Sequence, residues 1–255
     1  MKFLMLLSIL LSVLVGIARG VDLAVATNAA TGLCTVGSVW WRYAALGIAV
    51  LAAVLIGRHC AGKAENLCRR CPLAGVLAFA AAVCLLAGGA AQALLTVNGL
   101  ADMVRVVLQV LCAVWLSSLC RRWLTAGRWQ TPAGGLPLAV AGSVLFYWNV
   151  LMRFMENSSS WHRVGPTAAV WQMLAALLFL AALARALYLP EPGNGKALCA
   201  SGLAAFALCL CWQLPQTVQL AVQGSASELL TSLAVCCIGA LGGVCAAACA
   251  AAAKH

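Results

Sequence analysis

The stretch that decides the fold is PLAGVLAFAAAVCLLAGGAAQALL, residues 72–95. It contains no charged residue and does not alternate between polar and apolar positions, as a strand of a membrane barrel would. In the bilayer core every backbone N–H and C=O group needs a hydrogen-bond partner within the protein. An apolar run long enough to cross the bilayer must therefore be a helix, and we predict one transmembrane helix here.

Seven similar stretches lie on either side of this one. Eight spans of about 20 residues use roughly 160 positions, which leaves short loops and no soluble domain of any size. The chain has 255 residues, of which 64% are hydrophobic and only 9% charged, too few to cover a water-soluble globule. We predict an all-α, polytopic integral membrane bundle, a single membrane domain of residues 1–255, with about eight transmembrane helices at 3–18, 39–57, 72–95, 100–119, 136–152, 166–189, 197–222 and 229–252.

The net charge of +10 indicates how these helices are oriented. With the amino terminus inside, nearly all of the excess Lys and Arg falls in the loops on the inner side, as is usual for short cytoplasmic loops. Both termini are thus expected in the cytoplasm, and the expected location is the plasma membrane, or the cytoplasmic membrane of a prokaryote. Because topology explains the basic charge, the expected partner is the lipid bilayer and not nucleic acid.

The first span has a second interpretation. Lys2, the apolar run and the small residues Ala18 and Gly20 also fit a cleavable signal peptide. An uncleaved signal-anchor is the preferred interpretation, because the apolar run is long for a signal peptide. Cleavage would leave seven spans and place the amino terminus outside.

The two halves of the chain show a weak internal similarity. Aligning 1–127 with 128–255 pairs Gln92 with Gln219, among other residues. Each half would then hold four helices of the same orientation, a parallel duplication of the kind found in some transporters. Helices rich in Ala and Leu also align by chance, and chance is the favoured explanation.

Polar side chains within the spans are the best functional signal, because burying them in lipid is costly. Asp102, Arg105 and Gln109 fall on one face of the fourth span, where the carboxylate and the guanidinium can pair. Such a face can line a path for a polar solute. The favoured alternative is that Asp102 lies in the first helical turn, near the interface, and complements the helix dipole.

The seventh span carries a second polar face. Gln216, Gln219 and Gln223 recur at helical spacing, and Gln213 precedes them. Pro215 lacks an N–H group and leaves the carbonyl four residues before it without a helical donor, so we expect a kink or a polar contact there. Hydrogen bonds to neighbouring helices are the favoured role of these glutamines, and a solute path is the alternative.

The last span carries the pattern Gly239-x-x-x-Gly243, followed by small Ala and Cys residues. Such a surface lets two helices approach each other closely. The pattern predicts helix packing, and it fits either a neighbouring helix of the same chain or a partner subunit.

Most of the 14 cysteines lie inside the spans, where they resemble Ala or Ser as small packing residues. His59, Cys60, Cys68 and Cys71 follow the second span and could supply four zinc ligands. The gap between Cys60 and Cys68 is not a usual zinc spacing, and a cytoplasmic loop keeps its thiols reduced. Reduced cysteines without a metal are the favoured interpretation, and these four residues are weak metal candidates only.

Catalysis is the least supported class of function. Besides Asp102, only Glu156 and His162 of an outer loop are candidate acid–base residues. No Asp in that loop would orient the histidine, and no G-x-S-x-G elbow is present. We therefore assign no catalytic residue and expect no cofactor.

The leading hypothesis is a small permease-like transporter of a polar solute, because the chain combines eight spans and little soluble mass with two polar helix faces. No nucleotide-binding motif is present, so an ATP-driven role would need a separate subunit. The alternative is a non-catalytic membrane subunit or scaffold, either a homo-oligomer or bound to a partner subunit through small-residue helix faces.

Overall fold

A computed structural model describes residues 2–28, 32–60, 71–95, 99–125, 135–155, 164–189, 191, 193–223 and 226–251. The helices, in chain order, are α1 (Lys2–Val25), α2 (Val39–Cys60), α3 (Pro72–Leu95), α4 (Leu100–Leu124), α5 (Gly135–Met155), α6 (Val164–Tyr188), α7 (Asn194–Ala205), η2 (Phe206–Trp212), α8 (Gln213–Gln223) and α9 (Ala226–Ala251). The segments α7, η2 and α8 follow one another without a break and form the seventh span. Within the described residues, eight helices are long and apolar enough to cross a membrane, and the predicted all-α polytopic bundle is confirmed.

The first helix is longer than the sequence predicts. We expected its apolar run to end at Ala18, but α1 continues to Val25 and includes Arg19 and Asp22. These two charged residues are one helical turn apart and pair with each other. An opposite charge at this spacing lowers the cost of keeping both residues in a membrane span.

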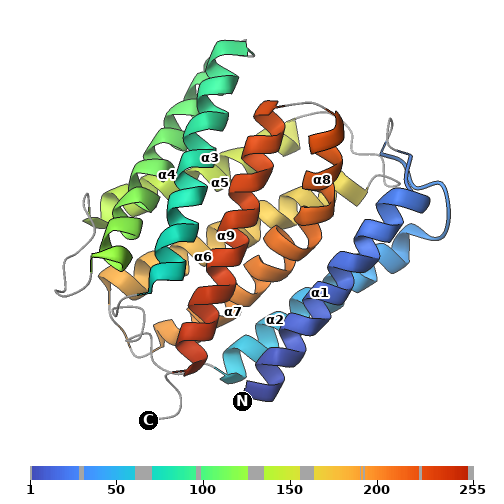
Figure 1. Ribbon diagram of the computed structural model, residues 1–255, viewed down its shortest axis with the longest axis horizontal. Helices are drawn as coiled ribbons and strands as arrows, with labels where there is room; N and C mark the ends of the chain where they lie inside the picture. Colours follow the sequence, from blue (N-terminus) through green and yellow to red (C-terminus); the bar gives the residue numbers. More distant parts are fainter. Residues whose placement is uncertain are drawn as a thin grey trace.

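Helix α9 lies in the middle of the bundle. In Figure 1 it runs between α3 on one side and the seventh span on the other, and it packs against both. Helices α1 and α2 cover the far side of the seventh span, and the chain runs from α3 through α4 and α5 to α6 with each helix packed on the next. Helix α1 begins and α9 finishes at the same end of the bundle (Figure 1). We call this the inner end, since the loop charges predict it to be cytoplasmic, and the opposite end the outer end.

The outward faces of the helices are apolar. On α1, Leu6, Leu10, Leu14 and Ile17 recur every three or four residues, and all are more than half exposed. In a bilayer a stripe of this kind faces the lipid. The opposite side of α1 carries small residues such as Gly16 and packs on the seventh span.

The seventh span widens in its middle, because η2 is a π-helix. Pro215 has no N–H group to donate to the carbonyl of Cys211, so the α-helical ladder is interrupted next to this segment. A β-carbon on Gly16 of α1 would lie 2.5 Å from the Cys211 carbonyl oxygen. A β-carbon on Gly239 of α9 would lie 2.6 Å from the backbone nitrogen of Leu210. The irregularity expected at Pro215 is therefore a wide π-helical turn, and the backbones of α1 and α9 pack closely against it.

Helices in the inner half of the bundle approach each other to direct backbone contact. Gly202 of α7 faces Gly242 of α9, and a β-carbon on Gly202 would lie 2.6 Å from the Gly242 carbonyl oxygen. Gly57 of α2 meets Ala200 of α7 in the same way, with 2.5 Å between the added β-carbon and the Ala200 Cα. Two helices thus press against α7 at points where no side chain would fit.

Candidate functional site

A cavity of about 740 Å³ lies in the outer half of the bundle. Side chains of α1, α3, α4, α5, α6, α8 and α9 line it, together with the loop after α1. Six glutamines belong to the lining, namely Gln92, Gln109, Gln172, Gln213, Gln216 and Gln219. The charged lining residues in the described part of the chain are Arg19, Asp102, Arg105, Arg153 and Glu228. Polar groups are costly inside a membrane, so a polar wall of this extent indicates a site.

The cavity reaches the middle of the bundle. On α5 its wall runs from Arg153, near the outer end, to Leu145, the middle residue of that helix. Helix α5 has 21 residues and is about 31 Å long, which matches a hydrocarbon core of about 30 Å. On α9 the wall reaches Val235, about 14 Å from the first residue of the helix. The deepest lining residues are therefore near the midplane of a bilayer.

The two polar faces considered in the sequence meet in this one cavity. The lining includes each of their described side chains, Asp102, Arg105, Gln109, Gln213, Gln216 and Gln219. Gln223 is the last residue of α8, and its side chain lies outside the described part of the chain. Sequence reasoning missed Gln92, Asn149 and Gln172, which also line the cavity. Their only signal was the isolated position of each polar side chain in an apolar span.

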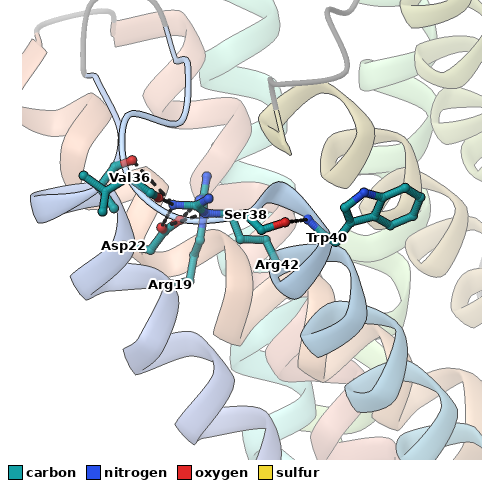
Figure 2. Close-up of polar contacts among 7 residues, drawn as sticks. Arg19, Asp22, Val36, Ser38, Trp40 and Arg42 are labelled. Carbon is teal, nitrogen blue, oxygen red and sulfur yellow. Dashed lines mark hydrogen bonds and ion pairs between the residues drawn. The ribbon is translucent and has the colours of Figure 1, made fainter.

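Arg19 is the most buried of the described charged residues on the cavity wall, and an ion-pair triad holds it (Figure 2). Its Nη1 donates a hydrogen bond to Asp22 Oδ2 at 2.5 Å. Arg42 of α2 donates to the other carboxylate oxygen, Oδ1, from Nε at 2.8 Å and from Nη2 at 2.5 Å. The Arg19 guanidinium carbon also lies 5.1 Å from the centre of the Trp212 ring, a cation–π contact. One carboxylate thus serves two guanidinium groups, and the triad carries a net positive charge.

Two amide side chains connect helices at the floor of the cavity. Gln172 Nε2 of α6 donates to the Leu208 carbonyl of η2 at 3.2 Å, and the Cys209 thiol donates to the Gln172 carbonyl at 3.2 Å. Gln213 Nε2 of α8 donates to Ser232 Oγ of α9 at 2.5 Å. Part of the glutamine face of the seventh span is therefore used for contacts between helices, and part of it faces the cavity.

Among the buried cavity-lining residues, three have a side-chain atom without a hydrogen-bond partner in the described part of the chain: Arg19 Nε, Gln109 Oε1 and Asn149 Oδ1. The three residues are 4%, 1% and 8% exposed. An unsatisfied buried polar group costs about 1–3 kcal/mol. One donor and two acceptors on cavity-lining residues are therefore left without a partner in the described part of the chain.

The packing glycines of the last helix have a neighbour within the chain. Gly239 lies against the backbone of η2, and a β-carbon on Gly243 would lie 2.6 Å from Cδ2 of the Phe206 ring. The seventh span makes both contacts. For this helix face the structure therefore favours the internal neighbour over a partner subunit.

The described weak metal candidates lie at the inner end and are not part of the cavity wall. His59 and Cys60 are the last residues of α2, Cys71 precedes α3, and Cys68 lies outside the described residues. In the part of the chain that the structure describes, no group of three His, Cys, Asp or Glu side chains is arranged to hold a metal ion.

The candidate acid–base residues are described only in part. Glu156 and His162 lie outside the described ranges. Asp102 lines the cavity from the first turn of α4, where its negative charge also complements the helix dipole.

Comparison of the chain with protein-family models, curated proteins and solved structures gives no match. A function for the cavity has to be inferred from its own side chains.

Proposed function

We propose that the chain is a small permease that binds a polar solute in the outer cavity and passes it across the membrane. The observation that carries this proposal is the polar cavity of about 740 Å³ within a bundle of apolar helices. Small-molecule sites usually measure about 300–1,000 Å³. The volume therefore suits a solute of the size of an amino acid or a sugar, with surrounding water.

The depth of the cavity supports the same function. Transporters commonly bind their substrates near the bilayer midplane, often beside interrupted helices. Here the wall reaches Leu145 in the middle of α5, and Gln172 on the wall bonds to the π-helical segment η2. A pore-free structural protein has no need for this arrangement, because each buried polar group lowers its stability in the membrane.

The difference between the two halves supports a cycle of alternating access. Helix α7 packs closely on α2 and α9 in the inner half, while the outer half holds the cavity. The seventh span belongs to both halves, since α8 lines the cavity and α7 makes the close contacts. A change at η2, which lies between them, would alter both halves together.

The alternative role as a scaffold subunit has less support. The best assembly surface in the sequence was the Gly239–Gly243 face, and the seventh span of the same chain covers it. The scaffold role also does not explain why polar side chains from seven helices surround one cavity.

The test is uptake by liposomes that contain the purified protein. The liposomes are incubated with a small-molecule extract of the producing cells, and retained solutes are identified by mass spectrometry. We expect at least one polar solute to accumulate with the wild-type protein. Gln216→Leu, on the cavity wall, should abolish that accumulation, whereas Thr125→Leu, at the exposed inner end of α4, should not. Identical solute profiles with and without the protein would refute transport.

A further inference from the structure

Charged residues on α1 and α4 are ordered by depth, whereas Arg153 of α5 lies near the outer end. On α1, Asp22 is one turn nearer the outer end than Arg19, and on α4, Asp102 is one turn nearer the outer end than Arg105. One turn of three residues amounts to about 4.5 Å along a helix. Glu228, the remaining carboxylate on the described wall, belongs to the first turn of α9 at the outer end. On both α1 and α4 the arginine therefore lies about one turn deeper along the helix than the carboxylate.

The charge balance of the site is positive. Among the described residues, three arginines and two carboxylates line the cavity. The triad adds one more positive charge on Arg42 and one more negative charge on Asp22. Among the described residues, a single carboxylate bound by two guanidinium groups leaves one positive charge unbalanced, and the three side chains are at most 17% exposed. An anion in the cavity would compensate it.

The uncharged side chains indicate the rest of the ligand. Gln109 Oε1 and Asn149 Oδ1 are buried acceptors without partners among the described residues, and they would receive hydrogen bonds from hydroxyl or amino groups. Arg19 Nε is a buried donor without a partner among those residues and suits an acidic oxygen. The cavity volume of about 740 Å³ exceeds what a halide ion needs and leaves space for a carbon skeleton.

We infer that the cavity binds a small organic anion, whose acidic group contacts Arg19 and whose hydroxyl or amino groups contact the amides of Gln109 and Asn149. The acidic group is a carboxylate or a phosphate, since a guanidinium group recognises both. This inference rests on the proposed function in that it takes the cavity as the solute site. It does not require that the bound anion be transported.

The experiment is a binding titration of the purified protein in detergent at constant ionic strength. Four anions are compared with four matched compounds that lack the net negative charge: succinate with succinamide, gluconate with sorbitol, glutamate with glutamine, and glycerol 3-phosphate with glycerol. We expect saturable binding of at least one anion and much weaker binding of its partner compound. Comparing the binding of the three carboxylates with that of the phosphate shows which kind of acidic group the cavity prefers.

The variants test the role of Arg19. Arg19→Gln should weaken anion binding by at least about tenfold, as expected for loss of a charged hydrogen bond. Arg19→Lys keeps the charge and should retain the preference for the anion. Arg121→Gln, an exposed arginine at the inner end of α4, is the matched control and should bind like the wild type. If Arg19→Gln does not fold, Arg42→Gln removes the excess positive charge without changing the cavity wall, and it should lower the anion preference.

The outcomes separate the two proposals. Equal binding of an anion and its partner compound, unchanged binding in Arg19→Gln, or no binding by any of the four anions would overturn the inference. Uptake of an uncharged solute by liposomes, combined with no binding of any of the four anions, would leave transport standing and exclude the anion. Anion binding that depends on Arg19, combined with no uptake of any solute, would leave the anion site standing and exclude transport.

Discussion

Replacing Asp22 with Asn should strongly destabilise the protein, because this carboxylate pairs with two largely buried guanidinium groups. The side chains of Arg19, Arg42 and Asp22 are 3%, 11% and 17% exposed. Asn has nearly the same shape as Asp, so packing is kept while the negative charge is lost. Two arginines of like charge then remain beside a neutral amide, at the junction of α1 and α2.

The expected magnitude follows from the burial of the triad. Removing one partner of a buried ion pair costs about 3–5 kcal/mol. The triad lies at the outer ends of its helices and Asp22 is partly exposed, so water screens some of the interaction, and we expect about 3 kcal/mol. For a chain of this size that corresponds to a fall of roughly 6–12 °C in Tm.

Thermal unfolding in detergent, followed by tryptophan fluorescence, measures this effect. The matched control is Glu191→Gln, because Glu191 pairs with Arg185 at 3.6 Å and both side chains are more than 60% exposed. An exposed pair contributes about 0–1 kcal/mol, so the control should unfold near the wild-type temperature. Adding Arg42→Gln to Asp22→Asn should restore part of the lost stability, because it removes one of the two like charges. Equal unfolding temperatures for Asp22→Asn and Glu191→Gln would refute the argument.

Two further outcomes follow from the packing of α1 and α7. The first span should be retained in the mature protein, because Gly16 and Arg19 pack against the seventh span. Measuring the intact mass of the protein from its native membrane tests this prediction. A mature chain that begins after the first span would contradict it. Gly202→Leu should prevent recovery of folded protein in a gel-filtration assay, because its first side-chain carbon would lie 2.6 Å from the Gly242 carbonyl oxygen. Gly47→Leu is its control, since a β-carbon there meets no atom within 4 Å, and equal yields of the two variants would show that α7 and α9 can separate.

The spans could be predicted from the sequence because hydropathy is a local property of each stretch. The end of the first span could not, because Arg19 and Asp22 resemble loop residues until their pairing is known. Contact between α1 and α2 supplies the second arginine of the triad, and no local pattern in the sequence reports it. The internal duplication of the two halves stays a prediction.

The cavity was predictable only in part, for a related reason. Helical spacing identified the polar faces that include Asp102 and Gln216, because residues on one helix have fixed relative positions. Whether these faces meet in one cavity depends on which helices are neighbours. Local patterns in the sequence do not show which helices pack together. Gln172 shows the limit clearly: it is one polar residue in an apolar helix, yet it bonds to the irregular segment of another span.

Arg19 links the ligand site to the part of the fold that would have to move in a transporter. Its guanidinium group lies over Trp212, the last residue of η2, and Gly16, one turn earlier on α1, packs on the Cys211 carbonyl. Helix α8 on one side of η2 lines the cavity, and α7 on the other side packs closely on α2 and α9. A π-helical turn can absorb a change in helix winding more easily than a regular α-helix, because its wider hydrogen-bond ladder is already irregular. In the proposed cycle, an anion that draws Arg19 away from Trp212 therefore acts directly on the segment between the cavity and the tightly packed inner half.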